Sequence, residues 1–155
     1  MQKQVTEPLG LLIAATRRRI KQVVATRAGR LGLTPQQFWL LAGLAEGGSQ
    51  SLHALAHRAR TDDPTASRVV QGLVTEGLVV SSPDPEDRRR ARLELTERGR
   101  ALAPKVVAEA QVIRGLVERD LTVAECEQVR AALRKVLASL ERSAAAHHIV
   151  ERDIP

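Results

Sequence analysis

Residues 63–96 read DPTASRVVQGLVTEGLVVSSPDPEDRRRARLELT. Asp63 and Pro64 predict the start of a helix, because an acidic cap is followed by a residue whose missing N–H costs nothing at that position. We expect the helix to run to about Glu76 and to be closed by Gly77, since glycine best adopts the left-handed conformation of a C-terminal cap. Its expected inward-facing residues are Val69, Val70 and Leu73.

Two short strands are expected after this helix. Leu78–Ser81 is a β-branched run, and in Ala91–Leu95 the charged residues Arg92 and Glu94 alternate with leucines. Between them, Ser82–Arg90 contains two prolines and six charged residues, which is typical of a loop. The pattern therefore predicts a hairpin with a long charged tip.

Helices are expected on the N-terminal side of this segment. Residues 5–29 carry apolar side chains at roughly helical spacing. Thr34, followed by a proline, predicts a second helix that ends at Gly47. Either Ser49 or Ser51 begins a short third helix.

Two further helices are expected on the C-terminal side. Thr96 begins the first, and Pro104 in its early part is expected to kink or restart it. Thr122 and Glu125 have the spacing of a capping box at the start of the last helix. From Ser143 the tail is rich in alanine and histidine, and we expect it to fray.

Composition excludes several classes of protein. The 155 residues suggest one compact domain, and no stretch approaches the roughly 18 unbroken apolar residues of a membrane span. We expect no secretory leader, because the apolar stretch at residues 9–16 is short and runs into three arginines. A single cysteine forms no internal disulfide and fits a reducing cytosol. Two aromatic residues cannot build a stacking platform for single-stranded nucleic acid.

The net charge of +6 favours an anionic partner, first of all the phosphates of DNA. The excess is unevenly placed. Residues 1–30 hold seven basic residues and one acidic residue, whereas residues 53–92 hold seven and six. DNA binding is therefore predicted from individually placed arginines, and the total charge mainly assists approach.

The order of helices, strand, charged loop and strand is typical of a winged helix-turn-helix, in which the second of two short helices enters the major groove. The predicted fold class is mainly α with a small β wing. Residues 34–96 are expected to form the DNA-binding region. The flanking helices, in 1–33 and 97–155, carry apolar stripes that one small domain cannot cover, so we expect them to pair in a two-fold dimer that reads a palindromic site.

Four motifs follow one another between residues 52 and 100. They are Leu52-x-x-Leu55-Ala56, Thr65-Ala66-Ser67-Arg68-Val69-Val70, Leu73-Val74-x-Glu76-Gly77-Leu78-Val79, and Asp87-Arg88-Arg89 followed by Leu93-x-Leu95-Thr96-x-x-Gly99-Arg100. In this order they resemble the MarR family of bacterial transcriptional regulators. The resemblance implies a dimeric winged-helix protein that binds a promoter and usually releases it when an effector binds.

Candidate DNA contacts are the polar residues left on the helix after its apolar residues turn inward, and the arginines of the hairpin. They are Thr65, Ser67, Arg68, Gln71, Arg88, Arg89, Arg90 and Arg92. Arginine reads guanine through two hydrogen bonds, and glutamine reads adenine in the same way. Asp87 is close enough to Arg89 across a turn to pair with it, which would aim the guanidinium at a narrow minor groove. The alternative is a solvated charged hairpin on some other helical protein.

Phe38 and Trp39 are the only aromatic residues, and they lie next to the place where family members hold aromatic effectors. We expect one of them to pack in the core, and Trp39 is the candidate for lining an effector pocket. The basic run at residues 17–21 either flanks the DNA or holds an anionic effector, or it is simply the solvated face of a dimerisation helix.

No metal, cofactor or redox site is predicted. His53 and His57 have the i, i+4 spacing that can hold a metal, but no cysteine or acidic partner lies nearby in sequence. Cys126 has acidic neighbours, which do not favour a reactive thiolate. No nucleophile motif or glycine-rich phosphate loop is present, so an enzyme is not expected.

The sequence thus predicts a cytoplasmic, nucleoid-associated DNA-binding regulator with no membrane partner. Its partners are expected to be a palindromic double-stranded operator, a second copy of the chain and a small effector, which the resemblance suggests is aromatic or phenolic. The alternative is a regulator that is constitutive, or that responds to a metal or a thiol reaction, without an organic effector.

Overall fold

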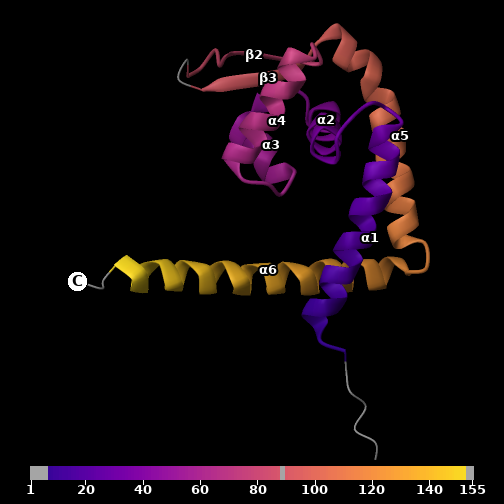
Figure 1. Ribbon diagram of the computed structural model, residues 1–155, viewed down its shortest axis with the longest axis vertical. Helices are drawn as coiled ribbons and strands as arrows, with labels where there is room; N and C mark the ends of the chain where they lie inside the picture. The colour runs from indigo at the N-terminus through magenta and orange to yellow at the C-terminus, as the bar shows by residue number, and fades with distance from the viewer. Residues whose placement is uncertain (1–6, 88–89, 153–155) are drawn as a thin grey trace, which may run out of the picture. The chain divides into compact units, whose positions relative to one another are not determined.

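The computed structural model describes residues 7–87 and 90–152, with side chains up to Ser143. The chain divides into two compact units, Met1–Arg114 and Gly115–Pro155. These units are defined by how compactly their residues pack. They do not test the expected division into a DNA-binding region and dimerisation helices, which stays a prediction. In chain order the elements are α1 (Leu9–Gly29), α2 (Pro35–Gly47), β1 (Gln50–Ser51), α3 (Leu52–Arg58), α4 (Asp63–Thr75), β2 (Val79–Pro83), β3 (Ala91–Leu95), α5 (Glu97–Glu118) and α6 (Val123–Arg152) (Figure 1).

Side-chain caps set the starts of α2 and α3. The Thr34 hydroxyl accepts a hydrogen bond from the Gln37 N–H, and the Gln37 side chain accepts one from the Thr34 N–H at 2.9 Å, which makes a capping box. Of the two serines considered for α3, Ser51 is the cap, since its hydroxyl accepts from the Ala54 N–H at 3.2 Å.

The start of α4 lies one residue earlier than expected. The cap is Asp62 rather than Asp63, because the Asp62 carboxylate accepts a 2.8 Å hydrogen bond from the N–H of Thr65, three residues ahead. That N–H lowers the pKa of Asp62 below its ordinary value. The predicted end is confirmed, since Gly77 has φ of +70°.

The hairpin is part of a three-stranded antiparallel sheet in the order β1-β3-β2. Strand β1 was not expected, because two residues are too few to show an alternation. Its Ser51 pairs with Arg92 in the central strand, and Arg92 pairs on its other side with Ser82. Strand β2 runs two residues beyond the predicted end at Ser81, because pairing with β3 continues to Pro83.

The hydrophobic core of the first unit joins α1, α2, α3, α4, the sheet and α5. Its largest fully buried side chains are Phe38, Leu40, Leu41, Leu44, Leu55, Leu73, Leu93, Val24, Val79 and Val106. Of the three residues expected to face inward on α4, Val70 and Leu73 are buried, and Val69 is half-buried. Helices α1 and α5 lie side by side, joined by a 2.6 Å ion pair between Arg27 and Glu109 (Figure 1).

The C-terminal helices differ from expectation in two places. Helix α5 does not restart at Pro104 but continues past it. The expected fraying from Ser143 is wrong for the described backbone, which stays helical to Arg152. The start of α6 is confirmed, since the Glu125 carboxylate accepts from the Thr122 N–H at 2.8 Å. Among the described helices, none is long and apolar enough to cross a bilayer.

Candidate nucleic-acid interface

Helix α4 presents a polar outer face. Ser67, Arg68 and Gln71 are exposed and Thr65 is half-buried, whereas Ala66 on the inner side is fully buried. A guanidinium N–H of Arg68 donates to the Thr65 hydroxyl at 3.3 Å, so the arginine lies along the first turn of the helix. The four side chains predicted for base or phosphate contact therefore lie clear of the core.

The wing, defined as residues 79–95, is a hairpin whose loop is organised by Asp84. The Asp84 carboxylate accepts a 2.8 Å hydrogen bond from the Glu86 N–H, and the Asp84 N–H donates to the Arg90 carbonyl at 2.8 Å. The Glu86 N–H holds the pKa of Asp84 below its usual value, and the positive charges of Arg92 and Arg90 add to this effect. The carboxylate is thus ionised at neutral pH and holds one side of the loop.

The arginines at the wing tip are only partly described. Arg88 and Arg89 lie outside the described residues, so the predicted pair between Asp87 and Arg89 stays a prediction. The Asp87 carboxylate lies 3.4 Å from Nε of Arg90, whose side chain is 74% exposed. An ion pair this exposed contributes little to stability and leaves the guanidinium accessible to a partner.

Arg92 was predicted to contact DNA, but its guanidinium is engaged within the protein. Its Nε donates to the Ser49 hydroxyl at 2.6 Å, and Nη1 lies 3.7 Å from the Asp84 carboxylate. The same hydroxyl donates to the Glu94 carboxylate at 2.7 Å. Alternation along β3 already put Arg92 and Glu94 on one face of the strand, but no sequence signal pointed to Ser49, 43 residues away.

His53 pairs with an acidic residue that sequence spacing did not bring near it. Its Nδ1 lies 3.0 Å from the Asp63 carboxylate at the start of α4. Together with Arg90 these residues line an open hollow of about 350 Å³ between the starts of α3 and α4 and the loop end of strand β3. Within the described part of the chain, no group of three or more histidine, cysteine or acidic residues could hold a metal ion.

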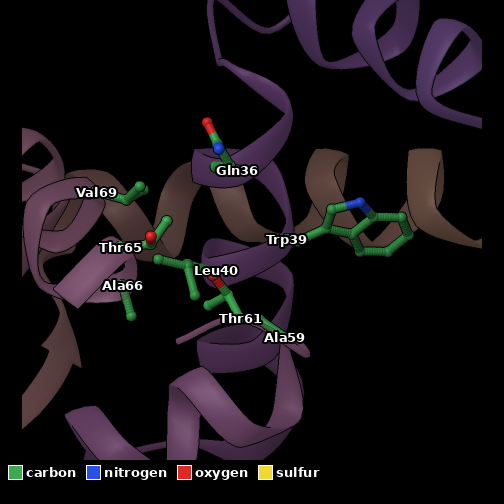
Figure 2. Close-up of a pocket in the computed structure, with 8 residues that line it drawn as sticks. All are labelled: Gln36, Trp39, Leu40, Ala59, Thr61, Thr65, Ala66 and Val69. Carbon is green, nitrogen blue, oxygen red and sulfur yellow. The ribbon is translucent and has the colours of Figure 1, made fainter. Parts of the chain in front are cut away.

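The two adjacent aromatic residues have different environments. Phe38 is fully buried, as expected for one of the pair, whereas Trp39 is 38% exposed and meets the Phe38 ring edge-on at 5.1 Å between centroids. Trp39 borders a hollow of about 60 Å³. Its lining comes from α2, from the segment after α3 and from α4, where it includes the half-buried Thr65 and Val69 (Figure 2). Whole small-molecule sites usually measure about 300–1,000 Å³, so the hollow as it stands holds one edge of a ring at most.

Two other groups from the sequence analysis lie on elements other than α4 and the wing. The basic residues of the run at 17–21 are exposed on α1, and Arg19 donates to the Gln22 side chain at 3.3 Å. Cys126 is buried in α6.

Comparison of the sequence with known proteins points to one family. Residues 31–90 match a family model described as the MarR family. The chain is 33% identical to the HTH-type transcriptional repressor NicR of Pseudomonas putida over 139 residues. This matched segment covers 90% of this chain and 88% of NicR.

Two solved structures share the fold. BpsR of Bordetella bronchiseptica, whose DNA binding is regulated by 6-hydroxynicotinic acid, is 29% identical, with a TM-score of 0.73 over 88% of this chain and 97% of that chain. A cysteine-to-serine mutant of MarR from E. coli, solved in complex with operator DNA, is 25% identical, with a TM-score of 0.72 over 84% of this chain and 94% of that chain.

Proposed function

The chain belongs to the MarR family of transcriptional regulators, and from this premise we propose that it is a homodimeric repressor that binds a palindromic operator. Helix α4 reads base edges in the major groove, and the wing reaches over the adjacent backbone. The observation that carries the proposal is the exposed polar face of α4, with Ser67, Arg68 and Gln71, on the same unit as the arginine-bearing wing.

Each element has a distinct role in this proposal. Arg68 and Gln71 have the side chains that read guanine and adenine, and the hydroxyls of Thr65 and Ser67 suit phosphate or base edges. In this proposal Arg88, Arg89 and Arg90 bind phosphate or the minor groove, where negative potential is concentrated. The fold shared with MarR, which has been solved on operator DNA, supports this use of the two elements.

Exposed apolar residues on the terminal helices support pairing of two copies. They are Leu9, Leu11 and Leu12 on α1, Val112, Leu116 and Val117 on α5, and Val123, Val129, Leu133, Leu137 and Leu140 on α6. Surfaces this apolar are rarely left in water by a monomer. A two-fold dimer would cover them and would present two copies of α4 to the two halves of a palindrome.

A small planar aromatic molecule is the proposed effector, and the hollow beside Trp39 is its proposed site. The hollow touches Thr65 and Val69 of α4, so a ring that opens it would move the reading helix relative to α2. The regulation of BpsR by 6-hydroxynicotinic acid supports an effector of this class. The small volume of the hollow favours the second candidate function, DNA binding that no organic effector controls.

Replacing Arg68 with alanine is expected to weaken operator binding by about 1–3 kcal/mol and to relax sequence preference, because an arginine-to-base contact is lost. Arg89→Ala is expected to cost a similar amount through the wing. The measurement is a band-shift titration on the DNA upstream of the gene, with random-sequence competitor. Arg134→Ala, which removes an exposed arginine from α6, is the matched control. Unchanged affinity of both test variants for a palindromic site would refute the assigned contacts.

Trp39 is the single tryptophan of the chain, so its fluorescence reports directly on the proposed effector site. We expect aromatic carboxylic acids from a panel of hydroxybenzoates and hydroxypyridine carboxylates to quench this fluorescence. Operator DNA should be released over the same concentration range. Trp39→Phe should lose the optical signal and shift the concentration needed for release. A flat response of both readouts across the panel would support the second candidate function instead.

A further inference from the structure

We propose that Arg92 is a positioning residue that fixes the wing through Ser49, Asp84 and Glu94 and does not itself contact DNA. We call these four residues the wing clasp. The inference rests on the proposed DNA-binding function, and it divides the wing arginines into those that reach the nucleic acid and one that orients them.

All three nitrogens of the Arg92 guanidinium face protein atoms. Nε donates to the Ser49 hydroxyl at 2.6 Å, Nη2 donates to the Ser49 carbonyl at 3.5 Å, and Nη1 lies 3.7 Å from Oδ2 of Asp84. Because the planar guanidinium offers its donors in a fixed fork, these contacts together determine its orientation. The Arg92 side chain is 40% exposed against 74% for Arg90, and its shortest contact is with the Ser49 hydroxyl.

The wing clasp joins parts of the DNA-binding region that are otherwise weakly connected. Arg92 lies on the central strand β3, Asp84 begins the wing loop, and Ser49 lies in the connection between α2 and α3. Backbone pairing between β1 and β3 covers only Gln50 and Ser51, which is a short ladder. The side-chain contacts therefore reinforce the join between the wing and the segment that leads into the reading helices.

Charge also argues against a phosphate at Arg92. Its guanidinium lies close to Asp84, and Glu94 is held on the same face through the shared Ser49 hydroxyl at 2.7 Å. The Asp84 carboxylate beside this guanidinium balances part of its charge, which weakens its attraction for phosphate. Arg90, two residues earlier, is 74% exposed, and its Nε lies 3.4 Å from the Asp87 carboxylate. The two arginines are thus suited to different tasks.

Asp84 links Arg92 to the backbone of the wing loop. The carboxylate that faces Arg92 also accepts from the Glu86 N–H at 2.8 Å, and the Asp84 N–H donates to the Arg90 carbonyl. Losing Arg92 removes one of the groups that hold this carboxylate in place. We therefore expect the hydrogen bonds that Asp84 makes with the Glu86 N–H and the Arg90 carbonyl to weaken.

The salt dependence of operator binding separates the two roles. A residue that neutralises a phosphate contributes about one unit to the slope of log K against log salt concentration, whereas a positioning residue does not. Arg92→Gln should weaken binding about tenfold with an unchanged slope. Arg90→Gln, the matched wing variant, should lower the slope by about one. A slope lowered by about one in Arg92→Gln would overturn the inference.

Ser49→Ala tests the wing clasp without removing a charge. It should weaken binding about threefold, and adding it to Arg92→Gln should weaken binding by clearly less than threefold, because the two residues share a hydrogen bond. Full additivity would overturn the inference.

A measurement without DNA keeps the inference distinct from the proposed function. In Arg92→Gln, hydrogen exchange of the Asp84 amide, which donates to the Arg90 carbonyl, and of the Glu86 amide, which donates to the Asp84 carboxylate, should accelerate while exchange in α2 and α4 is unchanged. Unchanged exchange at both wing amides would overturn the wing clasp even if DNA binding is confirmed. Failure of the wild-type protein to bind any DNA would overturn the proposed function, while faster exchange would still support the wing clasp as a structural device.

Discussion

Phe38→Ala is expected to lower the free energy of unfolding by about 3–5 kcal/mol, the cost of removing a large ring from a packed core. Phe38 is fully buried and packs among residues of the core cluster that joins α1, α2, α3, α4, the sheet and α5. The substitution would leave a cavity and would also remove the edge-to-face contact with Trp39. Urea unfolding monitored by circular dichroism measures the loss.

Two comparisons sharpen this test. Phe38→Leu keeps most of the volume and should cost only about 1 kcal/mol. Protein concentrations must be matched, because the stability of a dimer depends on protomer concentration. Equal losses in the alanine and leucine variants would contradict a packing role for the ring. Because the ring is enclosed, Phe38→Leu is also expected to respond to an effector as the wild type does, whereas Trp39 is positioned to touch one.

Gly99→Ala is expected to destabilise the protein by about 3 kcal/mol or more, because no space exists for a methyl group. A Cβ at Gly99 would lie 2.1 Å from the carbonyl oxygen of Leu78, which is backbone and cannot rotate away. That oxygen also accepts the Thr96 N–H at 3.1 Å, at the junction of β3 and α5. The first turn of α5 would have to move, and the hydrogen bond from the Gly99 N–H to the Thr96 hydroxyl would be strained.

Gly115→Ala in the same helix is the matched control. Nothing lies within 4 Å of a Cβ at that position, so helix propensity alone should stabilise the protein by up to about 1 kcal/mol. Melting temperatures of the two variants, measured at one protomer concentration, are expected to shift in opposite directions. A Gly99→Ala variant as stable as the wild type would contradict the close approach of α5 to Leu78.

The local starts and ends of helices were largely predictable from sequence. Thr34, Thr122 and Gly77 have the predicted roles because the groups they satisfy lie within a few residues along the chain. Where two adjacent residues both suit a helix cap, the sequence alone did not show which of them is the cap. Asp62 and Asp63 both suit a cap, and only the hydrogen bond from Thr65 distinguishes them.

The burial of Phe38 and the exposure of Trp39 show a second limit of prediction from sequence. Successive residues of a helix point about 100° apart, so one of two adjacent rings must turn away from the core. The sequence predicts this division but not which ring is enclosed. Packing of α2 against α4 and the sheet buries Phe38 and leaves Trp39 beside the small hollow.

The sequence by itself determined the order of the helices and of the two wing strands, most of the helix caps and the polar face of α4, because each depends on spacing along a few turns of chain. The tertiary structure decided the role of Arg92. From sequence it was one more arginine of a charged hairpin, but folding brings it against Ser49, 43 residues away, and against Asp84 across the wing. The partners of a side chain depend on which segments meet in the folded protein. Those neighbours decide whether a charged side chain is engaged within the protein or is available to bind nucleic acid.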